Sequence, residues 1–415
     1  MAPEVVPGLR RVVIVNDFGA VNGGAAQVAI ASALELARRG LQVDFLCAVG
    51  PVDARLAAAG VAVTCLDQHD ILNDPYRLRA AVRGIWNLSS ARALERLLTA
   101  ADPASTIVHV HGWTKALSAS VFRVTQRLGL HVVVTLHEYF TACPEGGFFD
   151  HGAGTICERR AMGAACLAAN CDSRSRAQKL WRVARQGVAT VFTDVHGGLP
   201  DVIYLSDLSR SLLAPYFGPS TRWHFVPNPI DVERGLRSDA ENQNEFVFVG
   251  RLSVEKGCAL FCEAVSVAGV EAVVIGDGPE MAALRRRWPR VRMTGWLDSA
   301  GVRSHLRRAR ALVLPSLCYE TQGLVVHEAL SCGVPVIVAD RTAARDAVLP
   351  GTNGLLFQQA SAASLVQAIG TLQSDDVVRQ MSENAYEGFW FAPPTLRAHG
   401  DSLLTAYADV LAVVR

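Results

Sequence analysis

Two acidic residues in residues 312–340 (LVLPSLCYETQGLVVHEALSCGVPVIVAD) have a spacing that could bind a phosphorylated sugar compound. Glu320 lies in a polar loop, and Glu328 lies in an apolar-periodic stretch that follows Gly323. If a helix begins near Gly323, its free N–H groups form a partly positive, anion-binding end. A phosphate on these amides would leave the two carboxylates to bind hydroxyls on either side, as in a sugar nucleotide. The alternative is a loop acid and a helix-surface acid with no shared task.

The elements that must position these acids form a strand-loop-helix-strand unit. The apolar run 311–314 and the second run 334–339 read as strands, and the stretch 324–330 reads as the helix between them. This order is the parallel crossover of an α/β sheet. Its loop lies at the carboxyl end of a strand, where open α/β sheets bind ligands.

Two basic residues repeat this placement earlier in the chain. Arg251 follows the apolar run 246–250, and Lys256 lies at the start of the next helix. A guanidinium and an ammonium in these places can converge on one diphosphate. A chance pair of surface cations is the alternative for any Arg-x4-Lys spacing.

Several motifs together resemble the retaining family 4 glycosyltransferases of GT-B fold. They are Gly-Arg-Leu-x3-Lys-Gly at 250–257, Val-Pro-Asn-x-Ile-Asp at 226–231 and the stretch 312–340, and the resemblance is densest from Arg251 onward. The resemblance implies a hexosyl transfer from a nucleotide sugar to a hydroxyl acceptor, with retention. It places Arg251, Lys256 and the amides of Gly323 and Leu324 on the departing diphosphate. Glu320 would position the donor sugar, and Glu328 would bind the ribose.

The same resemblance assigns residues in the N-terminal half. His137 follows the predicted strand 131–136 and would approach the 6-hydroxyl of the donor sugar, with Glu138 as its orienting neighbour or an acceptor contact. His111 either caps its strand or contacts the acceptor. Gly23 and Gly24 would either face the donor phosphate or form a plain tight turn. Trp296 would either pack on the nucleotide base or fill the core.

The chain also departs from the family pattern. The family's Glu-Gly-Phe-Gly is Glu320-Thr321-Gln322-Gly323 here, which keeps the acid and the last glycine. Residues 341–346 (RTAARD) stand where the family has Gly-Gly and a Glu, so a donor-sugar contact expected there is in question.

The length of 415 residues suits two domains. We predict two Rossmann-like domains facing an interdomain cleft, at 1–235 and 236–390, with a hinge in the polar stretch 233–245. A C-terminal helix in 391–415 would cross back onto the first domain. Predicted strands are 11–16, 42–47, 61–66, 106–110, 131–136, 202–206, 223–226, 246–250, 272–278, 291–297, 311–314 and 334–339.

Four cysteines fall in a glycine-rich insertion at 143–171: Cys143, Cys157, Cys166 and Cys171. No C-x2-C pair is present, so three alternatives stay open: a structural zinc, reduced thiols, or two disulfides. In any of them the insertion would be structural. No Asp-x-Asp stands in a suitable loop, so we expect catalysis without a divalent metal or another cofactor.

The net charge of +1 offers no global field for nucleic acid or for an anionic membrane. The N-terminal sequence has no signal-peptide pattern, and no apolar stretch is long enough to span a bilayer. We therefore expect a cytoplasmic enzyme, with peripheral contact to the inner membrane as one option. The expected donor is UDP- or GDP-linked, the acceptor is a glycan or a lipid-linked glycan, and the process is cell-surface polysaccharide synthesis. Alternatives are a GT-B sugar-nucleotide epimerase and a non-catalytic nucleotide-sugar-binding protein.

Overall fold

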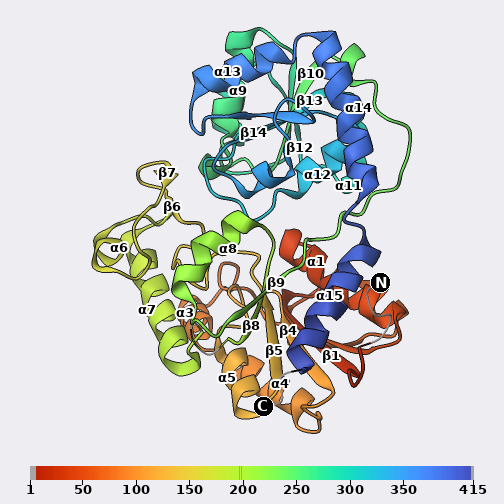
Figure 1. Cartoon of the computed structure of the whole chain (residues 1–415). Coiled ribbons are helices and arrows are strands. Elements are labelled where there is room, and N and C mark those ends of the chain that lie inside the picture. The colour runs from red at the N-terminus through yellow and green to blue at the C-terminus, as the bar shows by residue number, and fades with distance from the viewer. Residues whose placement is uncertain (1–5, 196, 198, 413–415) are drawn as a thin grey trace.

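The computed structural model describes residues 6–195, 197 and 199–412. Two separate parallel sheets, each covered by helices, form two domains that face one another (Figure 1). This arrangement confirms the predicted α/β fold with two Rossmann-like domains.

The N-terminal sheet has seven parallel strands in the order β3-β2-β1-β4-β5-β8-β9. Its five inner strands are largely buried on both faces, which is typical of parallel sheets, whereas the edge strands β3 and β9 are partly exposed. The strands are β1 (Arg11–Phe18), β2 (Gln42–Val49), β3 (Ala62–Cys65), β4 (Thr106–Val110), β5 (His131–Thr135), β8 (Asp201–Tyr204) and β9 (Arg222–Phe225). Every strand predicted for this half is present, with bounds shifted by at most a few residues.

The C-terminal sheet has six parallel strands in the order β12-β11-β10-β13-β14-β15. They are β10 (Glu245–Val249), β11 (Ala272–Ile275), β12 (Arg292–Gly295), β13 (Ala309–Leu314), β14 (Val336–Ala339) and β15 (Gly354–Phe357). The sequence did not predict β15, because its four residues directly follow a turn-rich stretch. It pairs with β14 at the sheet edge.

The helices cover both faces of each sheet. In the N-terminal domain they are α1 (Gly24–Arg38), α2 (Ala54–Ala58), α3 (Arg77–Ile85), α4 (Leu88–Leu98), α5 (Ser120–Arg127), α6 (Ala164–Ala168), α7 (Arg176–Thr193) and α8 (Asp207–Leu213). In the C-terminal domain they are α9 (Cys258–Ala268), α10 (Met281–Arg287), α11 (Ser299–Leu306), α12 (Leu324–Ser331), α13 (Ala362–Thr371) and α14 (Asp375–Phe391), and α15 (Leu396–Leu411) follows.

Each sheet has one point at which the strand order reverses. In the N-terminal sheet this point lies between β1 and β4, and in the C-terminal sheet it lies between β10 and β13. Ligands of open α/β sheets bind in the crevice outside the carboxyl ends of strands at such a point. The residues that follow these four strands line one shared pocket, so the two crevices face each other.

Helix α15 leaves the C-terminal domain and packs on the N-terminal one, as predicted. Figure 1 shows it beside α1. Leu403, Tyr407 and Val410 belong to a buried cluster of the N-terminal domain. His399 adds polar contacts, because its Nε2 lies 2.9 Å from Ser32 Oγ and its Nδ1 lies 2.8 Å from the Pro227 carbonyl oxygen.

The insertion forms the two-stranded antiparallel pair β6 (Phe149–Asp150) and β7 (Thr155–Ile156), followed by α6. All its cysteines are free, so the disulfide alternative is not realised. Among the described residues, no three His, Cys, Asp or Glu side chains are grouped so that they could hold a metal ion. Of the three alternatives, reduced thiols fit the described residues: Cys166 and Cys171 contact the buried Lys179 Nζ at 3.5 and 3.2 Å, and the zinc alternative is not assembled there.

Candidate active site

A pocket of about 480 Å³ lies between the two domains. Most of the predicted site residues line it: Gly23, Gly24, His111, His137, Glu138, Arg251, Lys256, Glu320, Gly323 and Leu324. Glu328 and Trp296 are not among the lining residues. The fold thus brings together ten residues that were predicted from both halves of the chain. The two domains supply opposite walls of the pocket.

The C-terminal wall carries an ion pair. Lys256 Nζ lies 2.7 Å from Glu320 Oε1, and Ser316 Oγ donates to the same oxygen at 2.6 Å. Burial would lower the pKa of Lys256, but the Glu320 carboxylate outweighs burial and raises it. Burial likewise would raise the pKa of Glu320, yet the ammonium and the hydroxyl lower it. Both groups are therefore charged at neutral pH, and the Glu320 carboxylate is held in place.

Close backbone packing positions this pair. Gly257 has φ +70, and a Cβ there would lie 2.1 Å from the Pro315 carbonyl oxygen, so only glycine fits. The Leu317 amide also donates to the Glu255 carbonyl at 2.8 Å. Glu320 itself has φ +51, a conformation rare for a residue other than glycine. These contacts bring the loop after β13 against the start of α9.

Free positive groups lie next to the ion pair. The amides of Leu324 and Val325, at the start of α12, donate no hydrogen bond within the described part of the chain. The same holds for the amides of Gly24 and Ala25 at the start of α1. Arg251 is exposed in the pocket and forms no ion pair with any described residue. Two helix N-termini and one guanidinium therefore offer an anion-binding site.

The protein's own packing does not require glycine at 23 or 24. Gly23 has φ 163, which is extended backbone that any residue adopts, and a Cβ there would meet nothing within 4 Å. A Cβ on Gly24 would approach only Leu324 Cδ1, at 3.7 Å. The tight-turn explanation therefore loses its physical reason, and space for a ligand between α1 and α12 becomes the better explanation.

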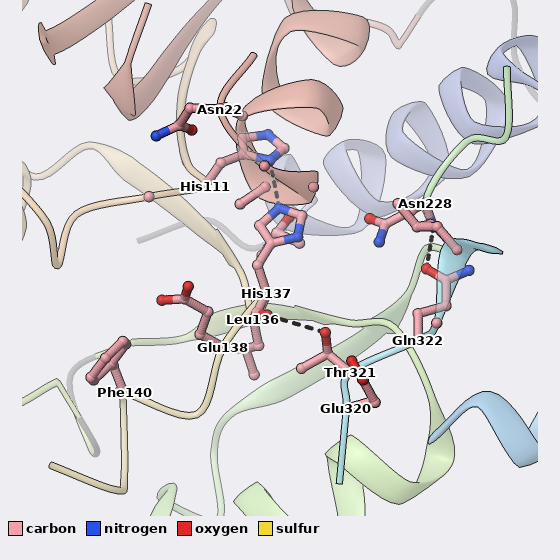
Figure 2. A pocket seen from close by; sticks show the side chains of 18 of the residues that line it. Asn22, His111, Leu136, His137, Glu138, Phe140, Asn228, Glu320, Thr321 and Gln322 are labelled. Carbon is pink, nitrogen blue, oxygen red and sulfur yellow. Dashed lines mark hydrogen bonds between the residues drawn. The ribbon is translucent and has the colours of Figure 1, made fainter. Parts of the chain in front are cut away.

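The N-terminal wall carries a pair of stacked histidines (Figure 2). His111 Nδ1 lies 3.0 Å from His137 Nε2. Burial lowers the pKa of His137 to about 3 and that of His111 well below its ordinary value. Both imidazoles are therefore neutral at pH 7. Only one of the two facing nitrogens carries the proton of the hydrogen bond between them, and the other accepts it.

The unpaired nitrogen of His111 identifies the proton's position. His111 Nε2 is buried and has no hydrogen-bond partner among the described residues. A proton there would leave a buried N–H unsatisfied, which is rarer than an unsatisfied acceptor. His111 Nδ1 therefore holds the proton and donates to His137 Nε2. The proton of His137 then lies on Nδ1, which has no described partner, so His137 presents an N–H donor.

Glu138 does not orient this histidine. Its side chain points away from the stacked rings in Figure 2, and its Oε1 lies 3.3 Å from Lys115 Nζ. The neighbouring Glu138 raises the pKa of Lys115. Lys115 lines the pocket and was not predicted, although it is one of only three lysines in the chain.

The two predicted residues outside the pocket have different surroundings. Glu328 is half-buried on α12; burial raises its pKa, and Arg303 partly opposes this shift. Trp296 is 75% exposed after β12, so it does not fill the core.

Three consecutive residues of the loop after β13 bond to the N-terminal domain. The Glu320 carbonyl accepts from the Tyr139 hydroxyl. Thr321 Oγ1 donates to the His137 carbonyl at 3.1 Å, and Gln322 Oε1 accepts from the Asn228 amide at 3.1 Å (Figure 2). Tyr319 also packs in the main hydrophobic cluster of the N-terminal domain. These contacts could not be predicted from the sequence, because each joins residues more than 90 positions apart.

Comparison with known proteins gives the family. The model described as Glycosyltransferase Family 4 matches residues 22–234, just over half of the chain, and the model described as Glycosyl transferases group 1 matches residues 243–375. An alpha-D-kanosaminyltransferase of Streptomyces kanamyceticus is 27% identical over 176 residues, which cover 40% of this chain and 45% of the relative. A GDP-mannose-dependent alpha-mannosyltransferase of Corynebacterium glutamicum is 30% identical over 167 residues, 40% of each chain. These alignments span less than half of either relative.

Solved structures match almost the whole length. Anabaena Alr3699/HepE in complex with UDP-glucose has a TM-score of 0.67 at 17% identity and covers 96% of this chain and 99% of its own. Sucrose-phosphate synthase from Thermosynechococcus elongatus has a TM-score of 0.68 at 17% identity and covers 97% and 99%. Such identities show the fold alone. With two facing parallel α/β domains and both family models matched in sequence, the chain belongs to glycosyltransferase family 4 and has the GT-B fold.

Proposed function

We propose that this protein transfers a sugar from a nucleotide-sugar donor to a hydroxyl acceptor, with retention at the anomeric carbon. The observation that carries the proposal is the composition of the pocket. One wall holds an unpaired guanidinium, a lysine-carboxylate pair and free helix amides, and the opposite wall presents a neutral imidazole N–H. An anionic diphosphate fits the first wall, and sugar hydroxyls fit the second.

The diphosphate would lie between the starts of α1 and α12, against Arg251 and Lys256. Negative charge grows on the leaving phosphate oxygen as the glycosidic bond breaks. Fixed positive groups stabilise this charge strongly in a pocket that excludes water. Because Lys256 is already paired with Glu320, the ammonium stays charged and keeps its position before the donor binds. Glu328 lies on the same helix, one turn beyond the free amides, where we assign it to the ribose.

The donor sugar would lie between Glu320 and His137. The carboxylate accepts hydrogen bonds from sugar hydroxyls, and His137 Nδ1–H donates one, so the two walls grip the sugar with complementary groups. The acceptor hydroxyl would enter from the side of Lys115 and Glu138. Because both domains contribute, their approach aligns the reacting atoms and excludes water.

The donor is a UDP- or GDP-linked sugar, a choice supported by the GDP-mannose-dependent relative and the UDP-glucose complex. The acceptor is a glycan or a lipid-linked glycan in cell-surface polysaccharide synthesis, and the reaction is cytoplasmic, at the inner face of the membrane. Of the helices in the described ranges, none combines the length and apolar character that a membrane span needs.

Ligand-detected binding of UDP, GDP, ADP and their sugars to the purified protein tests this proposal. We expect one nucleotide to bind, and Arg251→Ala to weaken its binding about tenfold or more. Arg286→Ala is the matched control, because Arg286 is exposed on α10 away from the pocket. Absence of binding to any of them would overturn the proposal. Release of free sugar without an acceptor would favour an epimerase or hydrolase, and binding without turnover would favour a binding protein.

A further inference from the structure

Large apolar side chains are exposed together on one flank of the N-terminal domain. Six of them define what we call the apolar patch: Tyr76, Leu78, Val82, Leu180, Val191 and Phe192. Leu78 is 86% exposed, Val82 67% and Val191 77%. Monomeric proteins expose single apolar residues often but contiguous apolar groups rarely, so such a patch indicates an interaction site.

The patch is contiguous because α3 and α7 pack on each other. Trp181 of α7 donates to the Ala81 carbonyl of α3 at 3.0 Å, and the ring centroid of Phe192 lies 5.7 Å from that of Trp86. Figure 1 shows the two helices side by side on the outer flank. Leu78 and Val82 are four residues apart, so they share one face of α3. On α7 the exposed residues 177, 180, 184 and 191 (Ala, Leu, Ala, Val) form a stripe without any charge.

Positive charge surrounds this patch. Helix α3 carries three arginines and no acid, and α4 carries two arginines and one acid, although the whole chain has a net charge of only +1. On α7 only Arg176 adds exposed charge, because Lys179 and Arg185 are buried and Arg182 pairs with Asp172. Arg79 and Arg83 of α3 and Arg92 and Arg96 of α4 line a basin of about 880 Å³ beside the patch, together with Asp67 and Glu95. Arg79 and Arg83 both pair with Asp74. Arg92 and Arg96 form no ion pair with any described residue, so their charge is available to a partner.

We infer that α3, α4 and α7 dock the protein on an anionic lipid bilayer, with the apolar patch in the acyl boundary and the arginine basin on phosphate headgroups. Exposed apolar faces bordered by basic side chains are the composition of interfacial helices, whose arginine stems extend to the headgroups. A second copy of this chain fits less well, because a two-fold contact through this flank would bring like charges together.

This surface lies behind the active-site wall. The inner face of α7 supports pocket-lining residues: Arg185 Nη1 donates to the Thr114 carbonyl at 3.0 Å, and Gln186 Nε2 donates to the Thr141 carbonyl at 2.8 Å. Docking through the outer face would therefore hold the acceptor side of the cleft close to the lipid surface. The inference itself does not rest on the proposed reaction, because lipid binding needs no donor.

Sedimentation of the full chain with vesicles tests the docking. We expect binding to mixed phosphatidylglycerol and phosphatidylcholine vesicles, weakening as salt is raised, and little binding to phosphatidylcholine alone. Leu78→Ser with Val82→Ser, and separately Arg92→Gln with Arg96→Gln, should each weaken binding about tenfold or more. All four side chains are partly or largely exposed, so the variants should keep the melting temperature and the nucleotide binding of the wild type.

The matched controls are Val267→Ser with Leu349→Ser, two exposed apolar residues of the C-terminal domain, and Arg285→Gln with Arg286→Gln on α10. These variants should bind vesicles like the wild type. The inference is overturned if the wild type ignores anionic vesicles, or if patch and control variants bind equally. It is also overturned if sedimentation velocity without lipid shows a dimer that Leu78→Ser dissolves, since the occupant would then be a second copy.

Discussion

The two walls of the cleft hold their functional groups in different ways. The C-terminal wall is charged: Lys256, Glu320 and Arg251 are ionised and lie within two short motifs. The N-terminal wall carries a neutral histidine pair next to the Lys115–Glu138 ion pair, and we call it the neutral wall after the histidines: His111 is buried, His137 is half-buried, both are uncharged, and they follow two different strands. The difference matches what each wall would bind, because a diphosphate needs opposite charge whereas sugar hydroxyls need oriented donors and acceptors.

The comparison also shows what keeps each wall in place. On the charged wall, attraction between Lys256 and Glu320 overcomes the cost of burying both groups. On the neutral wall, burial suppresses charge, and a single shared proton orients the rings. We therefore expect charge-removing substitutions to act on the first wall and proton-shifting ones on the second.

The largest effect is expected on the charged wall. Lys256→Ala should lower kcat/KM about a hundredfold or more, because it removes a charged contact to the leaving group and leaves the buried Glu320 carboxylate unpaired. Steady-state kinetics with the donor found by the binding panel measure this. Arg286→Ala should retain wild-type rates. Near-normal turnover of Lys256→Ala would show that the charged wall does not stabilise the transition state.

On the neutral wall, His137→Phe should lower kcat/KM about tenfold or more through loss of one hydrogen bond to the sugar. His111→Phe should have a smaller effect in the same direction, because it removes only the partner that fixes the His137 proton. Nitrogen NMR of labelled histidines reports that proton directly. We expect His137 to be protonated at Nδ1 in the wild type and to populate both tautomers in His111→Phe.

An unchanged tautomer in the His111 variant would show that another contact orients His137. A wild-type protein with the proton on His137 Nε2 would reverse the assignment made from the unpaired His111 nitrogen.

A smaller effect is expected where the walls meet. Gly24→Ala should raise the KM for the donor several-fold without lowering the melting temperature. The added methyl group meets only Leu324 Cδ1 at 3.7 Å in the protein, and alanine is the better helix former, so stability should be kept or raised. The same methyl group narrows the space between α1 and α12. An unchanged KM would show that the donor does not need the space next to Gly24, and that this residue only begins the helix.

The smallest effect concerns pH. The folded-state pKa is about 3 for His137 and about 4 for His399, both below the ordinary 6.5. As pH falls below 6.5, these histidines become protonated in the unfolded chain but stay neutral in the folded protein, so the free energy of unfolding decreases. Each such histidine lowers the free energy of unfolding by about 1.4 kcal/mol per pH unit between its folded-state pKa and 6.5. Urea unfolding at pH 7 and 5.5 should show lower stability at pH 5.5, with a shallower loss in His399→Gln.

His151 acts in the opposite direction, because Glu145 raises its pKa, and it lies in the insertion. A pH dependence equal in wild type and His399→Gln would show that His399 does not contribute to the slope.

Much of the charged wall could be predicted from the sequence because its geometry is local. Arg251 and Lys256 lie in one short loop segment, and Glu320 and Gly323 lie in another. The short spacing within each segment limits where the side chains can reach. The strand pattern then put each segment at the carboxyl end of a strand, and the structure shows that these strands, β10 and β13, are neighbours. That inference needed only the strong apolar periodicity of β10 and β13.

The neutral wall could be predicted only in part. His111 and His137 each follow a strand, which suggested the cleft, but nothing in the spacing shows that β4 and β5 are adjacent or that two rings share a proton. Strand pairing is non-local, and so are the contacts of Tyr139, Thr321 and Gln322. For the cysteines the sequence suggested more than the structure shows. Their proximity in sequence made a metal clip one alternative, and the described residues of the insertion do not assemble one.

The loop after β13 links the opening of the cleft to the state of the proposed sugar site. Glu320, Thr321 and Gln322 each bond to the N-terminal domain, and Tyr319 packs inside it. A cleft that opens by separating the domains must break all of these contacts at once, and the same loop carries the Glu320 carboxylate to which we assign the donor sugar. Under the proposed reaction, departure of the spent nucleotide and loosening of the sugar site would therefore be one event. We expect its rate to depend on the Tyr139 hydroxyl and the Thr321 and Gln322 side chains that join the domains, so that strengthening these contacts would lengthen the residence time of the product.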